Sequence, residues 1–200
     1  MKIGVLGGTF DPIHNGHLLI ADRVMTQLSL GKVLFVPAGR PWLKENRYIS
    51  AAEHRMEMVR LAIASRPHFE LSAVEVDRDG PSYMVDTIAN LQAQLSSSRE
   101  LYFILGWDNL TNLPCWREPE RLIKICCLVA VPRPGYNLPD LASLEKAIPG
   151  LSQRVVLLRG PNIGISASDI KERVTRGLSV SHLLPLPVGE YIKQHGLYNL

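Results

Sequence analysis

The residues best suited to chemistry lie close to the N-terminus, in the stretch Gly7-Gly8-Thr9-Phe10-Asp11-Pro12-Ile13-His14-Asn15-Gly16-His17. The glycine pair allows the backbone to approach a ligand closely. The first turn of the helix expected after it offers unpaired N–H groups to an anion. His14 and His17 are three residues apart, so both imidazoles can donate N–H groups to phosphate oxygens. The stretch therefore predicts a phosphate-binding site at a strand-to-helix turn.

Other interpretations of the histidine pair are structural capping or core packing, and half of a metal site. The surrounding Gly-Gly-Thr-Phe-Asp-Pro favours phosphate binding over both. Two common phosphate motifs are absent, because residues 4–8 do not begin G-x-G-x-x-G and no Gly-Lys-Ser or Gly-Lys-Thr follows. The missing dinucleotide motif also argues against a dehydrogenase.

A second candidate anion site lies late in the chain, where Ser166 and Ser168 stand at the expected start of a helix. Serine hydroxyls cap helices at such positions, and they can also turn outward to a phosphate. Capping alone is the structural alternative for both residues.

Six short apolar segments predict the strands that must position these residues. They are Ile3–Leu6, Lys32–Val36, Phe69–Val76, Leu101–Leu105, Cys127–Val131 and Val155–Leu158. Several are nearly continuous in Val, Ile and Leu, as expected when both faces of a parallel sheet are covered. Helices are expected over His17–Leu28, after Ser50, and over about Ser82–Leu95, Asp169–Gly177 and Val188–His195. Ser50-Ala51-Ala52-Glu53 has the pattern of a capping box.

Alternating strands and helices predict an α/β fold with a doubly wound parallel sheet and right-handed crossovers. Ligands of such sheets bind beyond the carboxyl ends of the strands, where Gly7–His17 would lie. No repeat or long low-complexity linker divides the chain. We therefore expect a single domain over residues 1–200.

Composition narrows the class of protein. With 46% apolar and 20% charged residues, the chain is typical of a soluble globular protein. The net charge of +3 is modest, and no cluster of Lys and Arg interleaved with aromatics indicates nucleic-acid binding. No stretch approaches the roughly 18 apolar residues of a membrane helix. The three cysteines, Cys115, Cys126 and Cys127, fit neither a disulfide framework nor a zinc ribbon, so we expect a cytoplasmic protein without thiol catalysis.

The motif GGTFDPIHNGH resembles the signature of the nucleotidyltransferase superfamily that carries H-x-G-H, and its GGTFDP form is similar to the nicotinate-nucleotide adenylyltransferase family of NAD synthesis. Further ordered segments extend the resemblance over nearly the whole chain. They are Ser82–Thr87, Gly106-Trp107-Asp108 with Leu113–Trp116, Arg133-Pro134-Gly135, Ile165–Lys171 and Tyr191–Tyr198. His54 and Arg55 resemble another family segment, H/K-R-x-x-M. The resemblance implies a Rossmann-like nucleotidyltransferase fold.

The resemblance implies catalytic roles for His14, His17 and Lys171. It implies ATP binding by Gly7, Gly8, Thr9, Phe10, Gly16, Gly106, Asp108, Arg133, Ile165, Ser166 and Ser168. The family usually has arginine where this chain has Lys171, and lysine supplies a point charge rather than a bidentate fork. Mg²⁺ would arrive with ATP, because no cluster of carboxylates in the sequence suggests a metal site of the protein's own.

For the mononucleotide, the resemblance implies that Trp116 stacks on a pyridine ring. The backbone N–H of Arg117 and the region of Thr87 would hold its carboxylate, and Lys44 would grip its phosphate. The structural alternatives are a hydrophobic anchor for Trp116 and a solvated loop charge for Lys44, whose local motif Pro41–Lys44 matches loosely.

The implied reaction joins nicotinate mononucleotide to ATP and gives deamido-NAD and pyrophosphate. Preference for nicotinamide mononucleotide is one alternative, because it needs the same chemistry. Another is a different H-x-G-H enzyme such as the pantetheine-phosphate adenylyltransferase, which chain length and Trp116 disfavour. A non-catalytic nucleotide- or RNA-binding module is a third, and a homo-oligomer is compatible with the sequence.

Overall fold

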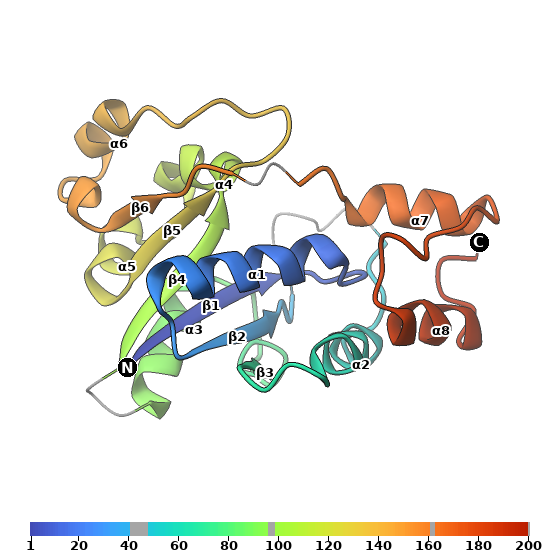
Figure 1. Cartoon of the computed structure of the whole chain (residues 1–200). Coiled ribbons are helices and arrows are strands. Elements are labelled where there is room, and N and C mark those ends of the chain that lie inside the picture. The colour runs from blue at the N-terminus through green and yellow to red at the C-terminus, as the bar shows by residue number, and fades with distance from the viewer. Residues whose placement is uncertain (41–47, 96–98, 161–162, 200) are drawn as a thin grey trace.

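The computed structural model describes residues 1–40, 48–95, 99–160 and 163–199. Six strands form one sheet in which all neighbours are parallel, in the order β3-β2-β1-β4-β5-β6 (Figure 1). The strands are β1 Lys2–Gly8, β2 Lys32–Pro37, β3 Phe69–Leu71, β4 Glu100–Gly106, β5 Cys127–Val131 and β6 Val155–Leu157. The order reverses between β1 and β4, which is the switch point where doubly wound sheets bind ligands. The predicted fold class is confirmed.

Eight α-helices lie in the described parts of the chain. They are α1 Asn15–Leu28, α2 Ala52–Ile63, α3 Met84–Gln94, α4 Trp107–Thr111, α5 Pro119–Ile125, α6 Leu141–Ala147, α7 Ala167–Thr175 and α8 Leu186–Gln194. Short 3₁₀ helices cover Leu113–Cys115 and Leu151–Gln153. The sequence did not predict α4, α5 and α6, because elements of 5, 7 and 7 residues are too short to show a helical period.

Strand side chains alternate between two buried clusters. On β1, Leu6 belongs to one cluster, while Ile3 and Val5 belong to the other. The cluster with Leu6 includes residues of α1, α2, α7 and α8, and the other includes residues of α3, α4, α5 and α6. Helices therefore lie on both sides of the sheet (Figure 1). This two-sided burial explains the nearly continuous apolar strands.

The third strand is shorter than predicted, ending at Leu71 rather than Val76. The Ser72 N–H still donates to the Phe35 carbonyl of β2 at 2.9 Å. After that residue the chain enters a helical turn, in which the Asp77 N–H donates to the Ala73 carbonyl at 2.9 Å. Alternating apolar residues misled the prediction, because local pattern does not show where strand pairing stops.

The capping-box prediction at Ser50 is wrong. The N-cap of α2 is Ala51, and no side chain caps this helix. The Ser50 N–H donates to Asp11 Oδ2 at 3.3 Å instead, so Ser50 links the start of α2 to the N-terminal motif.

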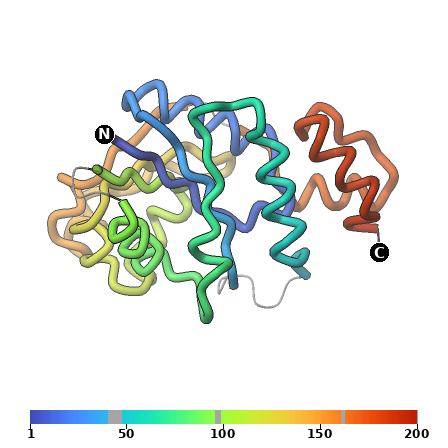
Figure 2. The backbone as a smooth tube through the Cα atoms, turned by 90° about the horizontal axis from the view of Figure 1, so that it is seen from below, coloured from blue at the N-terminus to red at the C-terminus, as the bar shows by residue number. Residues whose placement is uncertain are grey.

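The two last helices, α7 and α8, lie together near α2 at one end of the molecule (Figures 1 and 2). This is the end toward which β1 points. The late segment that begins at Ile163 therefore returns to the carboxyl edge of the sheet. Within the described residues, no helix is long and apolar enough to span a membrane.

Candidate active site

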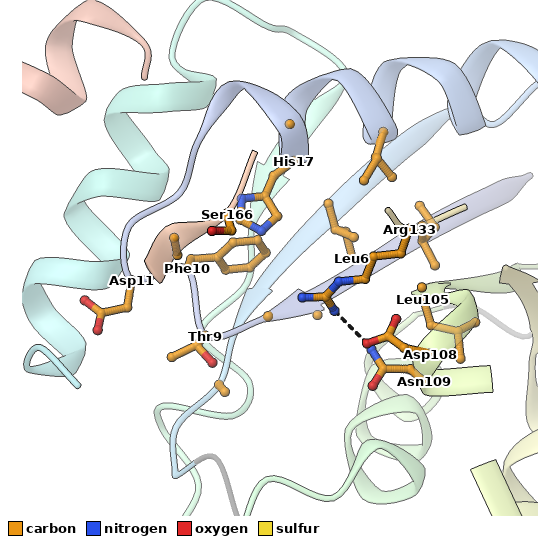
Figure 3. Close-up of a pocket in the computed structure, with 18 of the residues that line it drawn as sticks. Leu6, Thr9, Phe10, Asp11, His17, Leu105, Asp108, Asn109, Arg133 and Ser166 are labelled. Carbon is orange, nitrogen blue, oxygen red and sulfur yellow. Dashed lines mark hydrogen bonds and ion pairs between the residues drawn. The ribbon is translucent and has the colours of Figure 1, made fainter. Parts of the chain in front are cut away.

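A pocket of about 560 Å³ opens at the carboxyl ends of β1, β4 and β5. Its lining includes all three predicted catalytic residues, all eleven predicted ATP-binding residues, Trp116 and Arg117. Figure 3 shows Phe10, His17 and Ser166 close together, with Arg133 and Asp108 on another side of the pocket. The fold thus gathers segments that are more than 150 residues apart, since Gly7 and Ser168 both line it.

The two histidines begin α1 as a stacked pair. Their ring centroids are 3.7 Å apart, with an interplanar angle of 23°. His14 is the N-cap residue, and its backbone N–H donates to His17 Nδ1 at 3.2 Å. If His17 is neutral, its proton must therefore be on Nε2, which leaves that nitrogen as a donor. Phe10 supports the pair with an edge contact to His17 at 5.0 Å between ring centroids.

Burial lowers the pKa of His14 to about 4, and the positive charge of Arg133 adds a smaller effect in the same direction. His14 is therefore neutral near pH 7. A neutral imidazole can still donate one N–H to an anion, and it avoids placing a positive charge against the stacked ring of His17.

Gly16 stands between the histidines because no side chain fits there. An added Cβ would lie 2.9 Å from His14 Nδ1 and 3.0 Å from Ile163 Cγ2. Any larger residue would have to displace either the imidazole or the segment before α7. The glycine of the H-x-G-H pattern thus permits the close approach of two walls of the pocket.

Asp11 is a buried carboxylate, 4% exposed, that joins three distant parts of the chain. Its Oδ1 accepts from the Tyr198 hydroxyl at 2.8 Å, and its Oδ2 accepts from the Ser50 N–H and from the Lys171 ammonium. Burial alone would raise the pKa of Asp11, but the hydrogen bonds from Lys171, Tyr198 and Ser50 outweigh it and hold the pKa below its ordinary value. The carboxylate is therefore ionised at neutral pH.

Lys171 reaches the pocket wall from α7. Besides the Asp11 carboxylate, its ammonium lies 5.0 Å from the centroid of the Tyr198 ring. The side chain remains 27% exposed, so a ligand in the pocket can approach it. Lys171 thus lines the pocket, and its partner Asp11 was not among the predicted site residues.

Arg55 is a second buried charge, 2% exposed, in contact with the N-terminal motif. Its guanidinium donates to four carbonyls, those of Ser50, Thr9, Ala38 and Gly39, at 3.0, 3.0, 2.7 and 3.4 Å. Burial lowers the pKa of Arg55, whereas Asp11 and other acidic groups raise it. The five donors of arginine let one side chain fix the turn after β1 and the loop after β2 together.

The helix-start prediction at the second signature is confirmed for Ser166, which is the N-cap of α7. Its Oγ accepts from the Asp169 N–H at 3.1 Å. Ile165, Ser166 and Ser168 all line the pocket. The first turn of α7 therefore borders the same space as the first turn of α1, and both can present backbone N–H groups to an anion.

Asp108 and Arg133 form an ion pair of 2.6 Å at another wall. Asp108 Oδ1 is buried and has no hydrogen-bond partner among the described residues. An added Cβ on Gly106 would lie 2.3 Å from that oxygen, so the glycine makes room for the folded-back carboxylate. Neighbouring Asn109 also lines the pocket, and no pattern in the sequence had indicated it.

The remaining wall contains Trp116, Arg117 and Tyr83. The Trp116 ring packs on Phe103, at 6.0 Å between centroids, and is half-buried. It therefore contacts the core while it lines the pocket. The Arg117 guanidinium lies 4.8 Å from the Tyr83 ring centroid.

One predicted mononucleotide-binding residue, Thr87, is not in this wall. Thr87 is fully buried on α3 and does not line the pocket; its hydroxyl donates to Glu75 Oε1 at 2.6 Å. Glu75 itself does line the pocket. Lys44 lies outside the residues that the structure describes.

Among the described residues, no group of three or more His, Cys, Asp and Glu is arranged to hold a metal ion. Burial raises the pKa of the Cys126 thiol to about 12, so this thiol is protonated at neutral pH.

The fold and the paired-histidine turn define a class of nucleotidyltransferases, and residues 5–173 match the cytidylyltransferase-like family. Probable nicotinate-nucleotide adenylyltransferases of Dehalococcoides mccartyi (strain CBDB1) and Roseiflexus sp. (strain RS-1) are 48% and 45% identical to the chain, over 99% and 98% of its length and 97% of theirs. The chain belongs to the nicotinate-nucleotide adenylyltransferase family.

A solved structure supports the fold. The Plasmodium falciparum nicotinic acid mononucleotide adenylyltransferase complexed with NaAD superimposes with a TM-score of 0.78 at 20% identity, covering 99% of this chain and 97% of that one. The architecture is therefore retained in a protein of low sequence identity.

Proposed function

We propose that the chain transfers the adenylyl group of ATP to nicotinate mononucleotide, giving deamido-NAD and pyrophosphate. The observation that carries the proposal is the convergence of two helix starts, a neutral buried histidine and an ammonium on one pocket that also has an aromatic wall. The family membership supports the same reaction.

ATP would occupy the part of the pocket that we call the triphosphate side, defined by His14, His17, Ser166 and Lys171. The starts of α1 and α7 would donate backbone N–H groups to phosphate oxygens. The ammonium of Lys171 would add positive charge there. The glycines of β1 and β4, Thr9, Phe10, Ile165 and Ser168 would border the nucleotide, with Asp108 and Arg133 at its polar groups.

Nicotinate mononucleotide would occupy the acceptor side, defined by Tyr83, Trp116 and Arg117. The flat indole would stack on the pyridine ring. The backbone N–H of Arg117 would donate to the nicotinate carboxylate, and Lys44 would bind the phosphate. Since Thr87 is buried behind Glu75, it would act on this side by supporting Glu75 and the start of α3.

In the reaction, an oxygen of the mononucleotide phosphate bonds to the α-phosphorus of ATP. The bond between that phosphorus and the oxygen bridging to the β-phosphate breaks, and pyrophosphate leaves with the electron pair. The attacking phosphate has a second pKa of about 6, so it is largely dianionic at neutral pH and needs no dedicated base. Catalysis then depends on alignment and on stabilising the charge that develops.

The histidines suit this electrostatic task. A neutral donor held rigidly near the transferred phosphate stabilises developing charge without reorganising. Mg²⁺ would enter with the triphosphate and neutralise part of its charge.

Release of pyrophosphate from ATP, measured with each mononucleotide in turn, tests the proposal. We expect release with nicotinate mononucleotide and much slower release with the amide. Release with neither would refute the enzymatic function, and release only with the amide would refute the acceptor.

A further inference from the structure

Tyr198, near the end of the described residues, is bonded to Asp11 of the N-terminal motif, although the two lie far apart in sequence. Tyr198 is 7% exposed, and its backbone is left-handed, with φ of 67°. The Thr175 hydroxyl on α7 donates to the Tyr198 carbonyl at 2.9 Å. A tyrosine adopts this backbone conformation at a cost, so tertiary contacts must hold it in place.

The Tyr198 hydroxyl is bonded to Asp11 and also lies 4.0 Å from Met58 Sδ. The hydroxyl donates to Asp11 Oδ1, while the Lys171 ammonium and the Ser50 N–H use Oδ2. Both carboxylate oxygens are therefore fixed, and the carboxylate cannot rotate without breaking one of these bonds. The tyrosine ring also lies 5.0 Å from the ammonium of Lys171.

We propose that Tyr198 is a positioning residue for the triphosphate side: it orients Asp11 so that Asp11 holds the Lys171 ammonium where the phosphates of ATP bind. This inference rests on the proposed function, because it takes ATP as the ligand of Lys171. Tyr198 itself does not line the pocket. Its effect must therefore pass through Asp11 and Lys171.

The identity of the cation explains why such support is needed. Arginine has a planar fork that is largely preorganised, whereas lysine carries a point charge on a flexible stem. Ordering a flexible side chain on ligand binding lowers affinity. The Asp11 carboxylate and the Tyr198 ring order Lys171 before ATP arrives, so less ordering remains to be done when it binds.

Without the Tyr198 hydroxyl, Asp11 Oδ1 would be left buried without its donor. The carboxylate could then rotate. Its negative charge, no longer shared with the Tyr198 hydroxyl, would draw the Lys171 ammonium away from the phosphates. We therefore expect the affinity for ATP to fall about fivefold.

The chain offers a matched control in Tyr191 on α8. Its hydroxyl hydrogen-bonds a side chain as well, His54 Nδ1 at 2.9 Å, and it does not line the pocket. Tyr191→Phe and Tyr198→Phe therefore remove the same group from the same end of the chain. They differ in that one hydroxyl contacts Asp11 and the other does not.

The experiment measures dissociation constants of the whole protein for ATP and for nicotinate mononucleotide, by titration calorimetry, together with the melting temperature. We expect Tyr198→Phe to weaken ATP binding about fivefold, while mononucleotide binding stays within about twofold. Tyr191→Phe should change neither. In a Lys171→Met background, Tyr198→Phe should cause no further loss, because the cation through which it acts is gone.

Each outcome is decisive. If the wild-type chain does not bind ATP, the proposed function itself is wrong. If it does bind ATP and Tyr198→Phe leaves that affinity unchanged, weakens both substrates alike, or causes the same loss with and without Lys171, the positioning role is refuted and the proposed function stands. Should Lys171→Met fail to fold, the effect of Tyr198→Phe is measured in a Lys171→Gln background instead, because glutamine can still bond Asp11.

Discussion

The triphosphate side and the acceptor side of the pocket are built differently. On the triphosphate side, buried charges tie the motif to the rest of the fold: Asp11 and Arg55 are 4% and 2% exposed. On the acceptor side, Glu75 is also buried, at 3%, but the Arg117 side chain is 54% exposed, and it contacts the Tyr83 ring and, at 3.5 Å, Glu118. Stabilising developing charge requires donors that do not reorganise, whereas the acceptor side must admit a flat ring. The difference is therefore the one expected if the triphosphate side stabilises charge and the acceptor side binds the pyridine ring.

The strongest test of the triphosphate side is His17→Ala. Loss of one preorganised donor typically costs about 2.7–4 kcal/mol of barrier, so turnover should fall by a few hundredfold or more. The far-ultraviolet circular dichroism should be unchanged, because His17 is half-buried and replaceable within the helix. Exposed His68, which does not line the pocket, is the control, and His68→Ala should retain full turnover. Near-normal turnover of His17→Ala would contradict the role of that residue.

Arg55→Met tests whether the buried guanidinium stabilises the N-terminal motif on the triphosphate side. It leaves four carbonyls without their donor, and one buried unsatisfied group alone costs about 1–3 kcal/mol. We expect the free energy of unfolding in urea to fall by about 3 kcal/mol. Arg60→Met removes an exposed guanidinium from the same helix and should change it little. Equal stability of the two variants would show that Arg55 does not brace the motif.

The buried histidine gives a pH test of that side. The pKa of His14 is about 4 in the folded protein, below its ordinary value of 6.5, so the unfolded chain binds a proton that the folded chain does not. Stability from His14 is therefore complete above pH 6.5 and is lost as the pH falls toward 4. Between pH 7 and pH 5, wild type should lose up to about 2 kcal/mol more than His14→Asn in urea unfolding. Parallel losses in the two proteins would mean that His14 titrates normally.

On the acceptor side, Trp116→Leu should act on one substrate. Loss of an aromatic platform under a base costs about 1–3 kcal/mol, so KM for the mononucleotide should rise about tenfold. KM for ATP should be almost unchanged. Trp116→Phe keeps a flat ring and should recover part of the loss. If both KM values rise together, the two sides of the pocket do not act independently.

Much of this molecule could be predicted from local pattern. Residues 7–17 indicated phosphate binding because glycines, histidines and a helix start act within one turn of chain. Ser166 was correctly placed at a helix start for the same reason. The strands were recognised because burial on both faces makes each of them continuously apolar, except that β3 ended early where pairing with β2 stopped.

Other features depended on contacts between distant residues. The sequence predicted Ser50 as a capping residue, but its N–H donates to Asp11 instead. Thr87 fell within a motif, yet it is buried behind Glu75, which no motif had marked. Nothing adjacent to Arg55 in the chain shows that it would be surrounded by carbonyls of three separate segments.

The sequence by itself determined the class of the fold, the strand-to-helix turn that carries the histidine pair and the family, because each is encoded in residues a few positions apart. The tertiary structure decided what holds that turn in place. Asp11 and Tyr198 are separated by 187 positions, and their hydrogen bond exists only because α7 and α8 return to the carboxyl edge of the sheet. The partners of a buried charge come from distant residues that pack against it, and no local sequence pattern shows which residues these are.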